Sequence, residues 1–347
     1  MDAKSLTETV QELMAPGKGL LAMDESNPTC NKRFAALNIA QTPEMRRIYR
    51  ELIVTAPGLG DYISGAILFD ETIRQKLSSG TTFVDALRQV GIVPGIKVDM
   101  GTRELALFAG EKITEGLDGL AGRVKEYFQM GARFAKWRAV IVIGDGIPTA
   151  GCMDANAQAL ARYAAICQAA GLVPIVEPEV LMDGRHTLAE CSTVTEELLH
   201  RVFHQLHKQR VMLEGMILKP NMVLPALACP KQAAVEEVAD ATVRCLLRSV
   251  PAATGGVAFL SGGQPAQPAT ERLNAMNVRW KSKMPWPLTF SFSRAIQQPA
   301  LEIWAGNSGN VNAAQQALVH RTRCNSAARQ GGYSPDMERA SRRATGL

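Results

Sequence analysis

Two stretches in the middle of the chain decide the fold: VPIVEPEV at residues 173–180 and GMILKPNM at residues 215–222. Each is a short apolar run that ends in a charged residue followed by proline, Glu177 in the first and Lys219 in the second. A residue before proline favours extended backbone, and proline cannot donate to the next rung of a sheet. Both runs are therefore predicted strands that stop at the charged residue.

Similar strand-sized runs recur along the chain. There are eight of them: Gly19–Met23, Gly65–Phe69, Gly95–Val98, Phe134–Trp137, Val173–Val176, Met216–Leu218, Val257–Leu260 and Leu288–Phe292. Segments with helical periodicity separate them, such as Ala157–Ala170 and Thr195–Arg210. Between Lys97 and Ser261 the polar residues at the run ends recur about every 40 residues, as one strand–loop–helix unit would. Eight units predict an α/β fold, a single (β/α)₈ or TIM barrel. A doubly wound open sheet is less favoured, because no G-x-G-x-x-G follows the first run.

Composition narrows the class of protein. The chain has 347 residues, of which 46% are hydrophobic and 20% charged, so a disordered or fibrous protein is excluded. A net charge of +5 is too small to indicate nucleic-acid binding. No apolar stretch approaches the roughly 20 residues that span a bilayer. Seven scattered cysteines without a C-x-x-C pair favour reduced thiols. We expect a soluble, cytoplasmic protein with no nucleic-acid or membrane partner.

No linker rich in proline, glycine or serine divides the chain. The sequence predicts one barrel domain over residues 1–331, with its last helix at Val311–Cys324. Residues 332–347 are predicted to be a mobile C-terminal tail.

Charged residues cluster where the runs end, and in such a barrel the carboxyl ends of the strands form the active-site face. Lys97, Lys136 and Lys219 would converge there. Because crowded cations lower each other's pKa, one of these lysines is expected to carry a neutral amine that can attack a carbonyl group. Glu177 and Glu179 lie two residues apart, so they project to one side and suit proton transfer. A single charged strand end is usually solvated surface, but recurrence at five runs argues for a site.

The seventh run ends in FLSGGQ at residues 259–264. Ser261 and Gly262 offer a hydroxyl and backbone N–H groups that can approach a phosphate closely. Arg294 follows the eighth run. The loops after strands 7 and 8 are the recurrent phosphate site of this fold, so a phosphate-binding loop is predicted here.

Taken together, these motifs resemble the class I fructose-1,6-bisphosphate aldolases. LLAMDES, AILF, GIKVD, FAKWR, VEPE, LKPNM, FLSGGQ and SFSRA occur in that order between Gly17 and Tyr333. The resemblance implies reversible cleavage of fructose 1,6-bisphosphate to dihydroxyacetone phosphate and glyceraldehyde 3-phosphate through a lysine Schiff base. The pathway would be glycolysis, gluconeogenesis or the Calvin cycle. It implies a homotetramer with a phosphorylated sugar as substrate. No cofactor and no metal are implied, because the imine itself serves as the electron sink.

The resemblance also implies roles for single residues. Lys219 matches the Schiff-base lysine, Glu177 the acid/base that moves protons, and Lys136 the lysine that keeps the Lys219 amine neutral. Asp24 matches the carboxylate near the C4 hydroxyl, and Glu179 a supporting hydrogen-bond partner.

The resemblance to the family also implies two phosphate sites. The residues that match the C1-phosphate site are Ser261, Gly262 and Arg294. The residues that match the C6-phosphate end are Lys97, Arg138, Ser26, Lys32 and Arg33.

The sequence departs from the family pattern in three places. Ser293 stands where glycine is common, and it would be strained if the position required a positive φ. The chain ends in Thr345–Leu347 rather than the tyrosine that aids proton exchange in many eukaryotic relatives, so another group moves that proton or the exchange is slow. Asn307 replaces a lysine, which affects only a peripheral contact.

Three alternatives remain open. An imine-forming enzyme could act on another phosphorylated sugar, such as sedoheptulose bisphosphate, although two basic clusters favour two phosphates. A non-catalytic scaffold is less favoured, because every expected reacting residue is present. A zinc-dependent aldolase could use His200, His204 and His207, but these flank the apolar face of their helix, so a solvated surface is favoured.

Overall fold

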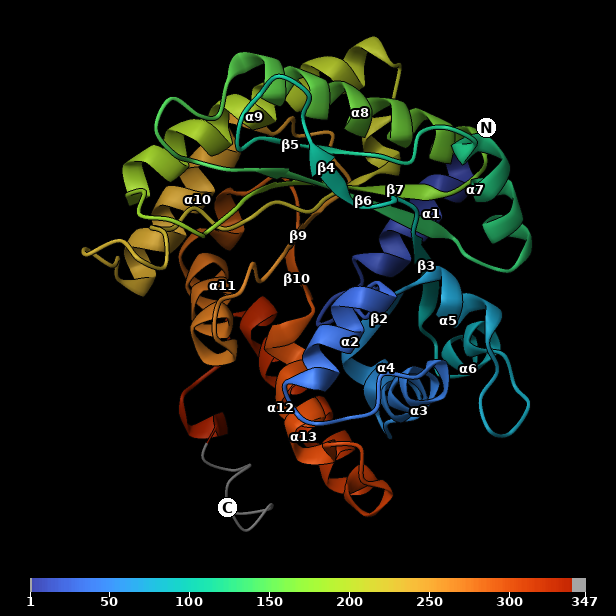
Figure 1. Ribbon diagram of the computed structural model, residues 1–347. Helices are drawn as coiled ribbons and strands as arrows, with labels where there is room; N and C mark the ends of the chain where they lie inside the picture. The colour runs from blue at the N-terminus through green and yellow to red at the C-terminus, as the bar shows by residue number, and fades with distance from the viewer. Residues whose placement is uncertain (1, 339–347) are drawn as a thin grey trace.

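Eight parallel strands close into a barrel in the computed structural model, which describes residues 2–338 (Figure 1). Their order around the barrel is β1-β10-β9-β8-β7-β6-β3-β2. The strands are β1 (Gly19–Ala22), β2 (Ile63–Leu68), β3 (Val93–Lys97), β6 (Phe134–Ile141), β7 (Val173–Val180), β8 (Ile217–Leu218), β9 (Val257–Phe259) and β10 (Leu288–Phe292). Each overlaps one of the eight predicted runs, so the predicted (β/α)₈ barrel is confirmed and the open sheet is excluded.

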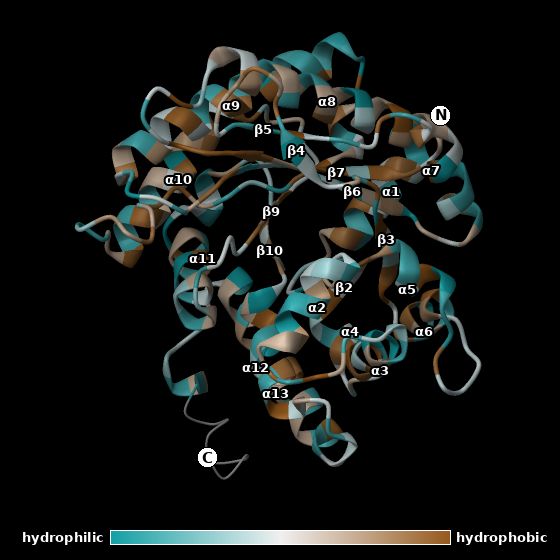
Figure 2. Cartoon of the chain, viewed as in Figure 1, coloured by the Kyte–Doolittle hydropathy of each residue, from teal (hydrophilic) through white to brown (hydrophobic). Residues whose placement is uncertain are grey.

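Helices surround the barrel, and in Figure 2 they carry alternating hydrophobic and hydrophilic stretches. The helices are α1 (Ala3–Leu13), α2 (Asn27–Ala35), α3 (Pro43–Val54), α4 (Leu59–Tyr62), α5 (Asp70–Arg74), α6 (Phe83–Gln89), α7 (Leu120–Gln129), α8 (Ala150–Ala169), α9 (Leu188–Lys208), α10 (Val235–Ser249), α11 (Ala266–Trp280), α12 (Arg294–Trp304) and α13 (Val311–Gln330). A separate antiparallel pair, β4 (Thr102–Glu104) and β5 (Lys112–Thr114), follows β3. Among the described residues, no helix is both long and apolar enough to cross a bilayer.

Proline acts differently in the two strands that define the fold. Strand β8 ends before Pro220 as predicted, but β7 continues past Pro178 to Val180. The backbone N–H of Lys219 donates to the carbonyl of Val176. The backbone N–H and C=O groups of residues 176, 178 and 180 of β7 therefore point toward β8. Because β8 has already ended opposite Pro178, the missing N–H leaves no partner unpaired. The side chain of Asn221 then accepts from the N–H of Val180 at 2.9 Å.

The barrel interior has an apolar lower level. Side chains from alternate strand positions, such as Ile67 and Phe134, form a cluster there that helix α1 closes with its buried face. Strand glycines make room for this ring: a Cβ on Gly95 would lie 2.3 Å from Phe134, and one on Gly65 would lie 3.1 Å from it. Only glycine at these positions lets the ring fill the barrel at such density.

Above the rings, the inward positions of the strands turn polar. Register pairs Lys97 with Lys136 across β3 and β6, and Arg138 with Glu177 across β6 and β7. The outward positions stay apolar, as where Trp137 packs on a tyrosine of α8 with ring centroids 5.6 Å apart. The polar side chains inside the barrel are therefore packed against apolar side chains deeper in the barrel and between the strands and the helices.

The described part of the C-terminal segment packs against the barrel helices. Tyr333 is buried, and Glu338 pairs with Arg321 of α13 at 2.6 Å. Residues 339–347, including the Thr345–Leu347 end, lie outside the described residues. All seven cysteines fall within the described residues, and each is buried with a free thiol.

Candidate active site

Lys219 sits at the tip of β8 inside the mouth of the barrel and is only 3% exposed. Its Nζ lies 3.2 Å from Oε1 of Glu177, which comes from the neighbouring strand β7. The backbone hydrogen bond from Lys219 to Val176, at 2.8 Å, fixes the register that brings the amine and the carboxylate together. The site is thus built on strand ends rather than on mobile loops.

Glu177 connects Lys219 to a second lysine. Its Oε2 lies 3.4 Å from Nζ of Lys136, and that ammonium group also lies 2.7 Å from Oδ2 of Asp24 and 3.9 Å from Oδ2 of Asp99. These side chains alternate in charge along a buried chain. Four of the residues predicted at different strand ends are therefore brought into one contiguous group.

The expectation that cation crowding lowers the pKa of the lysines is wrong for Lys136. Burial alone would lower the pKa of Lys136, but attraction to Asp24, Glu177 and Asp99 outweighs it and raises that pKa. The pKa of Asp24 is lowered in turn: burial opposes this, whereas Lys136 and Lys219 favour it. Because Lys136 lies among three carboxylates, it is a fixed positive charge.

Glu25, next to Asp24, anchors a second network that also borders the cleft. Its carboxylate accepts from Arg33 at 2.6 Å and from Arg50 at 2.5 Å. Gln297 of α12 donates to the same carboxylate at 2.9 Å. Burial alone would raise the pKa of Glu25, but Arg50 and Arg33 hold it well below its usual range. This network fixes the loop after β1, which carries Asp24.

Sequence reasoning missed Arg50 and Gln297 as parts of the site. Both lie on helices, α3 and α12, away from any strand end, and a basic residue in a helix carries no signal of burial. Arg50 is 2% exposed, which is rare for arginine unless it is paired.

One side of the mouth carries further ion pairs. Nζ of Lys97 lies 2.6 Å from Oδ1 of Asp99, and Nε of Arg138 lies 2.5 Å from Oε2 of Glu179. Glu179 and Glu177 both face the interior, but Glu179 pairs with Arg138 and Glu177 pairs with the lysines. The two carboxylates therefore do not act as a pair.

The predicted phosphate loop lies at another part of the mouth. Gly262 and Gly263 both have positive φ, +60° and +102°, so the turn after Ser261 requires glycine. A Cβ on Gly263 would lie 3.1 Å from Nη2 of Arg294. The guanidinium group of Arg294 thus lies against the loop, as a site for a phosphate group needs.

Ser293 is not strained in the way the family pattern suggested. Its φ is −107°, outside the left-handed region, and its hydroxyl donates to Oε1 of Glu25 at 2.7 Å. Nη2 of Arg33 lies 3.5 Å from the same hydroxyl. Serine therefore adds a link that glycine could not make.

The other predicted phosphate-binding residues separate in space. Arg33 lies with Glu25 and Ser293, not with Lys97 and Arg138. Lys32 is exposed on α2, and the hydroxyl of Ser26 lies 3.1 Å from that of a neighbouring threonine. All these residues still line one cleft.

That cleft has a volume of about 1370 Å³ and runs from Lys97 to Arg294 across the buried lysines. Two buried polar atoms that line it, Oε2 of Glu177 and Oγ of Ser291, make no hydrogen bond among the described residues, although Oε2 keeps its ion pair with Lys136. Buried polar atoms are normally hydrogen-bonded, so both can accept a hydrogen bond from the hydroxyls of a bound molecule.

The zinc alternative finds no support in the histidines proposed for it. His200, His204 and His207 are exposed on α9, while Leu198, Leu199 and Leu206 of the same helix are buried. Within residues 2–338 these histidines do not form a group close enough to share an ion.

Comparison with known proteins gives one consistent family. The model of the family described as fructose-bisphosphate aldolase class-I matches residues 5–346. A probable fructose-bisphosphate aldolase class 1 from Xanthomonas axonopodis pv. citri is 53% identical over 96% of this chain and 99% of its own length. The cytosolic fructose-bisphosphate aldolase 4 of Arabidopsis thaliana is 51% identical over 93% of this chain and 82% of its own.

A solved structure agrees with these sequences. Fructose-bisphosphate aldolase from Plasmodium falciparum, crystallised with TRAP and a small-molecule inhibitor, superposes with a TM-score of 0.94 at 47% identity. The match covers 96% of each chain.

Proposed function

The chain belongs to the class I fructose-bisphosphate aldolases, which cleave fructose 1,6-bisphosphate to dihydroxyacetone phosphate and glyceraldehyde 3-phosphate, and from this premise we propose that Lys219 forms the imine. One observation carries the assignment: the buried amine of Lys219 adjoins the alternating chain of Glu177, Lys136 and Asp24. Lys136, by contrast, lies among three carboxylates that raise its pKa, and Lys97 pairs with Asp99 at the end of its own strand.

Imine formation needs one proton removed from nitrogen and one delivered to oxygen. The neutral amine of Lys219 attacks C2 of the open-chain ketose and gives a carbinolamine. Glu177, at 3.2 Å from that nitrogen, is placed to take the ammonium proton and later to deliver a proton to the C2 hydroxyl, which leaves as water. The positive charge of Lys136, 3.4 Å from Oε2, holds Glu177 in position between these transfers.

Carbon–carbon cleavage then needs a base at the C4 hydroxyl. We assign this position to Asp24, whose carboxylate reaches the cleft floor beside Lys136. As the C4 hydroxyl proton leaves, the electron pair of the C3–C4 bond moves toward the imine, and the aldehyde product is released. The resulting enamine is protonated at C3 and hydrolysed, which frees Lys219 and the ketose phosphate.

Two basic ends of the cleft support a substrate with two phosphates. Ser261, Gly262 and Arg294 are assigned to the C1 phosphate, and the glycine turn supplies the backbone N–H groups. Lys97 and Arg138 are assigned to the C6 phosphate, and Ser26, Lys32 and Arg33 line the same cleft. Glu179 positions Arg138 through their ion pair.

We also propose that the protein acts in the cytoplasm as a homotetramer, with residues 1–331 as its single folded domain. The cytosolic names of plant relatives support the location. Sedimentation of the purified chain would test the assembly, and a monomer at assay concentration would contradict it.

Reductive trapping tests the imine. The enzyme is incubated with fructose 1,6-bisphosphate, reduced with borohydride and mapped by peptide mass spectrometry. We expect one adduct, on Lys219, lost in Lys219→Met and retained on Lys219 in the matched Lys97→Met variant. An adduct on Lys136, or trapping that survives Lys219→Met, would overturn the assignment.

A further inference from the structure

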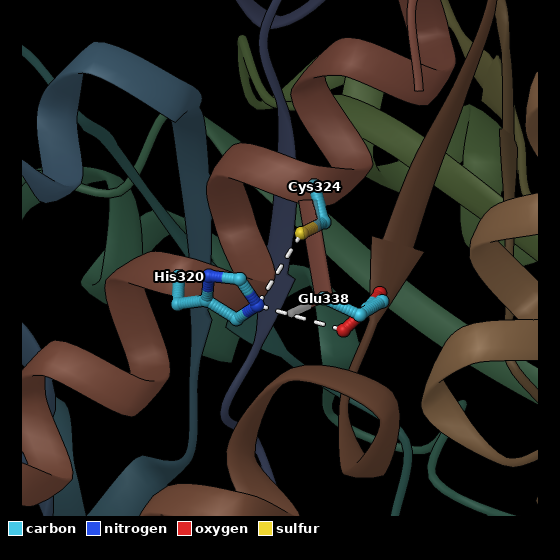
Figure 3. A group of neighbouring side chains, drawn as sticks. All are labelled: His320, Cys324 and Glu338. Atoms are coloured by element: carbon cyan, nitrogen blue, oxygen red, sulfur yellow. Dashed lines mark hydrogen bonds and ion pairs between the residues drawn. The ribbon is translucent and has the colours of Figure 1, made fainter. Parts of the chain in front are cut away.

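A group of metal-ligating side chains lies on the last helix, away from the catalytic cleft. His320 and Cys324 stand one turn apart on α13, and the segment after the helix returns Glu338 beside them (Figure 3). Nε2 of His320 lies 3.6 Å from Sγ of Cys324 and 3.5 Å from Oε2 of Glu338. All three ligand atoms lie within 4.8 Å of one another, and the three side chains point toward a common centre.

These separations match those of ligands around a tetrahedral ion. With metal–ligand bonds of about 2.0–2.3 Å, neighbouring nitrogen, sulfur and oxygen ligands of zinc lie about 3.3–3.7 Å apart. Imidazole, thiolate and carboxylate are also the donor types that zinc takes in proteins. The two separations from His320 therefore already match, and the third, between Sγ of Cys324 and a carboxylate oxygen of Glu338, is within 4.8 Å.

The carboxylate of Glu338 is oriented by two neighbours, and its Oε2 also faces His320. The hydroxyl of Tyr333 donates to Oε1 at 2.9 Å, and Nη1 of Arg321 lies 2.6 Å from both oxygens. Such outer contacts are typical of carboxylates that bind metals. The positive charge of Arg321 opposes a cation, but a carboxylate and a thiolate together balance a divalent ion.

We propose that His320, Cys324 and Glu338 form a zinc site that fixes the segment after α13 to the barrel. The ion bonds to Nε2, Sγ and Oε2, with water in the fourth position. The thiol proton of Cys324 leaves to solvent, so one proton is released for each ion and no redox change occurs.

The site would tie three parts of the fold together. Arg321, which holds Glu338, also donates from Nη2 to the hydroxyl of Thr270 at 2.8 Å and to the carbonyl of Ala266 at 3.3 Å. Both belong to the first turns of α11, which follows the phosphate loop. The role is structural: none of the three ligands lines the catalytic cleft.

Cobalt is the probe for this site, because a thiolate ligand gives Co²⁺ a sulfur-to-metal charge-transfer band and tetrahedral geometry gives strong visible bands. Full-length protein is freed of metal with a chelator and titrated with Co²⁺. We expect both signals to saturate at one ion per chain and to disappear when Zn²⁺ is added. Thermal unfolding should shift upward by about 4 °C at a hundredfold excess of Zn²⁺ over its Kd.

Matched variants separate this site from chance binding. Cys324→Ser and His320→Gln should lose the charge-transfer band and the thermal shift. Cys245→Ser, a buried helical cysteine elsewhere, and His200→Gln, an exposed helical histidine, should keep both. His320 is partly exposed, so His320→Gln keeps the test open if Cys324→Ser fails to fold.

Two outcomes would overturn the proposal. One is folded wild-type protein that shows no thiolate band and no thermal shift. The other is a band that persists in both Cys324→Ser and His320→Gln, which would mark adventitious binding elsewhere. Cleavage of fructose 1,6-bisphosphate by the chelated protein is expected to continue in either case, so this test does not depend on the proposed catalytic residues.

Discussion

Oε1 of Glu177 lies 3.2 Å from Nζ of Lys219, although the two residues are separated by a complete strand–helix–strand unit. Strands β7 and β8 are hydrogen-bonded neighbours, and their register places both side chains inside the barrel. A slip of one residue would turn the amine to the outside, since side chains alternate along a strand. Imine chemistry in this protein therefore depends on the register of the sheet as much as on the lysine itself.

Replacing Glu177 with glutamine should slow the proton transfers around the imine. We expect kcat for fructose 1,6-bisphosphate to fall about 10²–10⁴-fold, because an amide cannot exchange the protons that dehydration needs. Borohydride trapping should slow in parallel. Glu179→Gln is the matched control on the same strand, since that carboxylate pairs with Arg138 instead. If Glu179→Gln lost more kcat than Glu177→Gln, the acid/base role would belong to position 179.

Lys136→Met should lower stability and raise the pKa of Asp24. The substitution leaves two buried carboxylates without their shared cation, and breaking such a pair costs about 3–5 kcal/mol. The native pKa of Asp24 is lowered, so its charge stabilises the fold above the unfolded pKa; without Lys136 the same charge destabilises it there. Urea unfolding should show a deficit that is largest near neutral pH and shrinks as pH falls and Asp24 becomes protonated.

The double variant Lys136→Met/Asp24→Asn checks the cause of that loss. Removing the unpaired carboxylate should recover part of the stability, since the two sites are coupled. A double variant less stable than Lys136→Met alone would show that packing, not charge, accounts for the deficit.

Lys97→Met should change substrate preference. If Lys97 contacts the C6 phosphate, kcat/KM for fructose 1,6-bisphosphate falls about 10–100-fold, which corresponds to one charge-assisted hydrogen bond. Fructose 1-phosphate, which lacks that group, should be cleaved at a nearly unchanged rate. Arg294→Met is the contrasting variant and should impair both substrates. Equal losses for both substrates in Lys97→Met would remove Lys97 from the C6 end.

The barrel and its central lysines could be predicted from sequence because the signals are local. Each strand is a short apolar run, and its inward and outward positions alternate, so a charged residue at a run end must lie at the mouth. Pro220 marks the end of β8 for a steric reason that acts within two residues. The positions of Lys219 and Glu177 at the mouth can be predicted from these rules without knowing how the barrel closes.

What the sequence could not reveal depends on closure of the barrel. Arg50 and Gln297 reach Glu25 from helices α3 and α12, because β1 pairs with β10 and brings both ends of the chain together. The raised pKa of Lys136 could not be predicted from the sequence for the same reason. The sign of the field at a buried amine depends on which carboxylates lie between the cations, and no local pattern reports that.

Ser293→Gly should weaken the loop before α12. The hydroxyl donates to Glu25 at 2.7 Å, and a hydrogen bond to a charged group contributes about 1.5–3 kcal/mol. Ser293→Ala isolates the hydroxyl and should give most of the same loss in urea unfolding. A Ser293→Gly protein more stable than wild type would show that the serine backbone is strained.

Glu25→Gln should make the free energy of unfolding less sensitive to a fall in pH. Burial alone would raise the pKa of Glu25, but Arg50 and Arg33 hold it far below the unfolded value. Its charge therefore stabilises the fold above the unfolded pKa of about 4.3, and that contribution is lost as pH falls toward the folded pKa. At pH 7 the variant should be less stable by about 3–5 kcal/mol, since the buried guanidinium group of Arg50 and the partly buried one of Arg33 lose their partner.

Urea unfolding of Glu25→Gln and wild type at pH 7, and at intervals down to about pH 3, measures this difference. The gap between the two proteins should narrow as the solution becomes more acidic, because wild type loses a contribution that the variant never had. Glu44→Gln, at an exposed pair with Arg47, is the matched control and should follow wild type closely. A gap that stays constant or widens with acidity would mean that Glu25 acts through packing rather than through its charge.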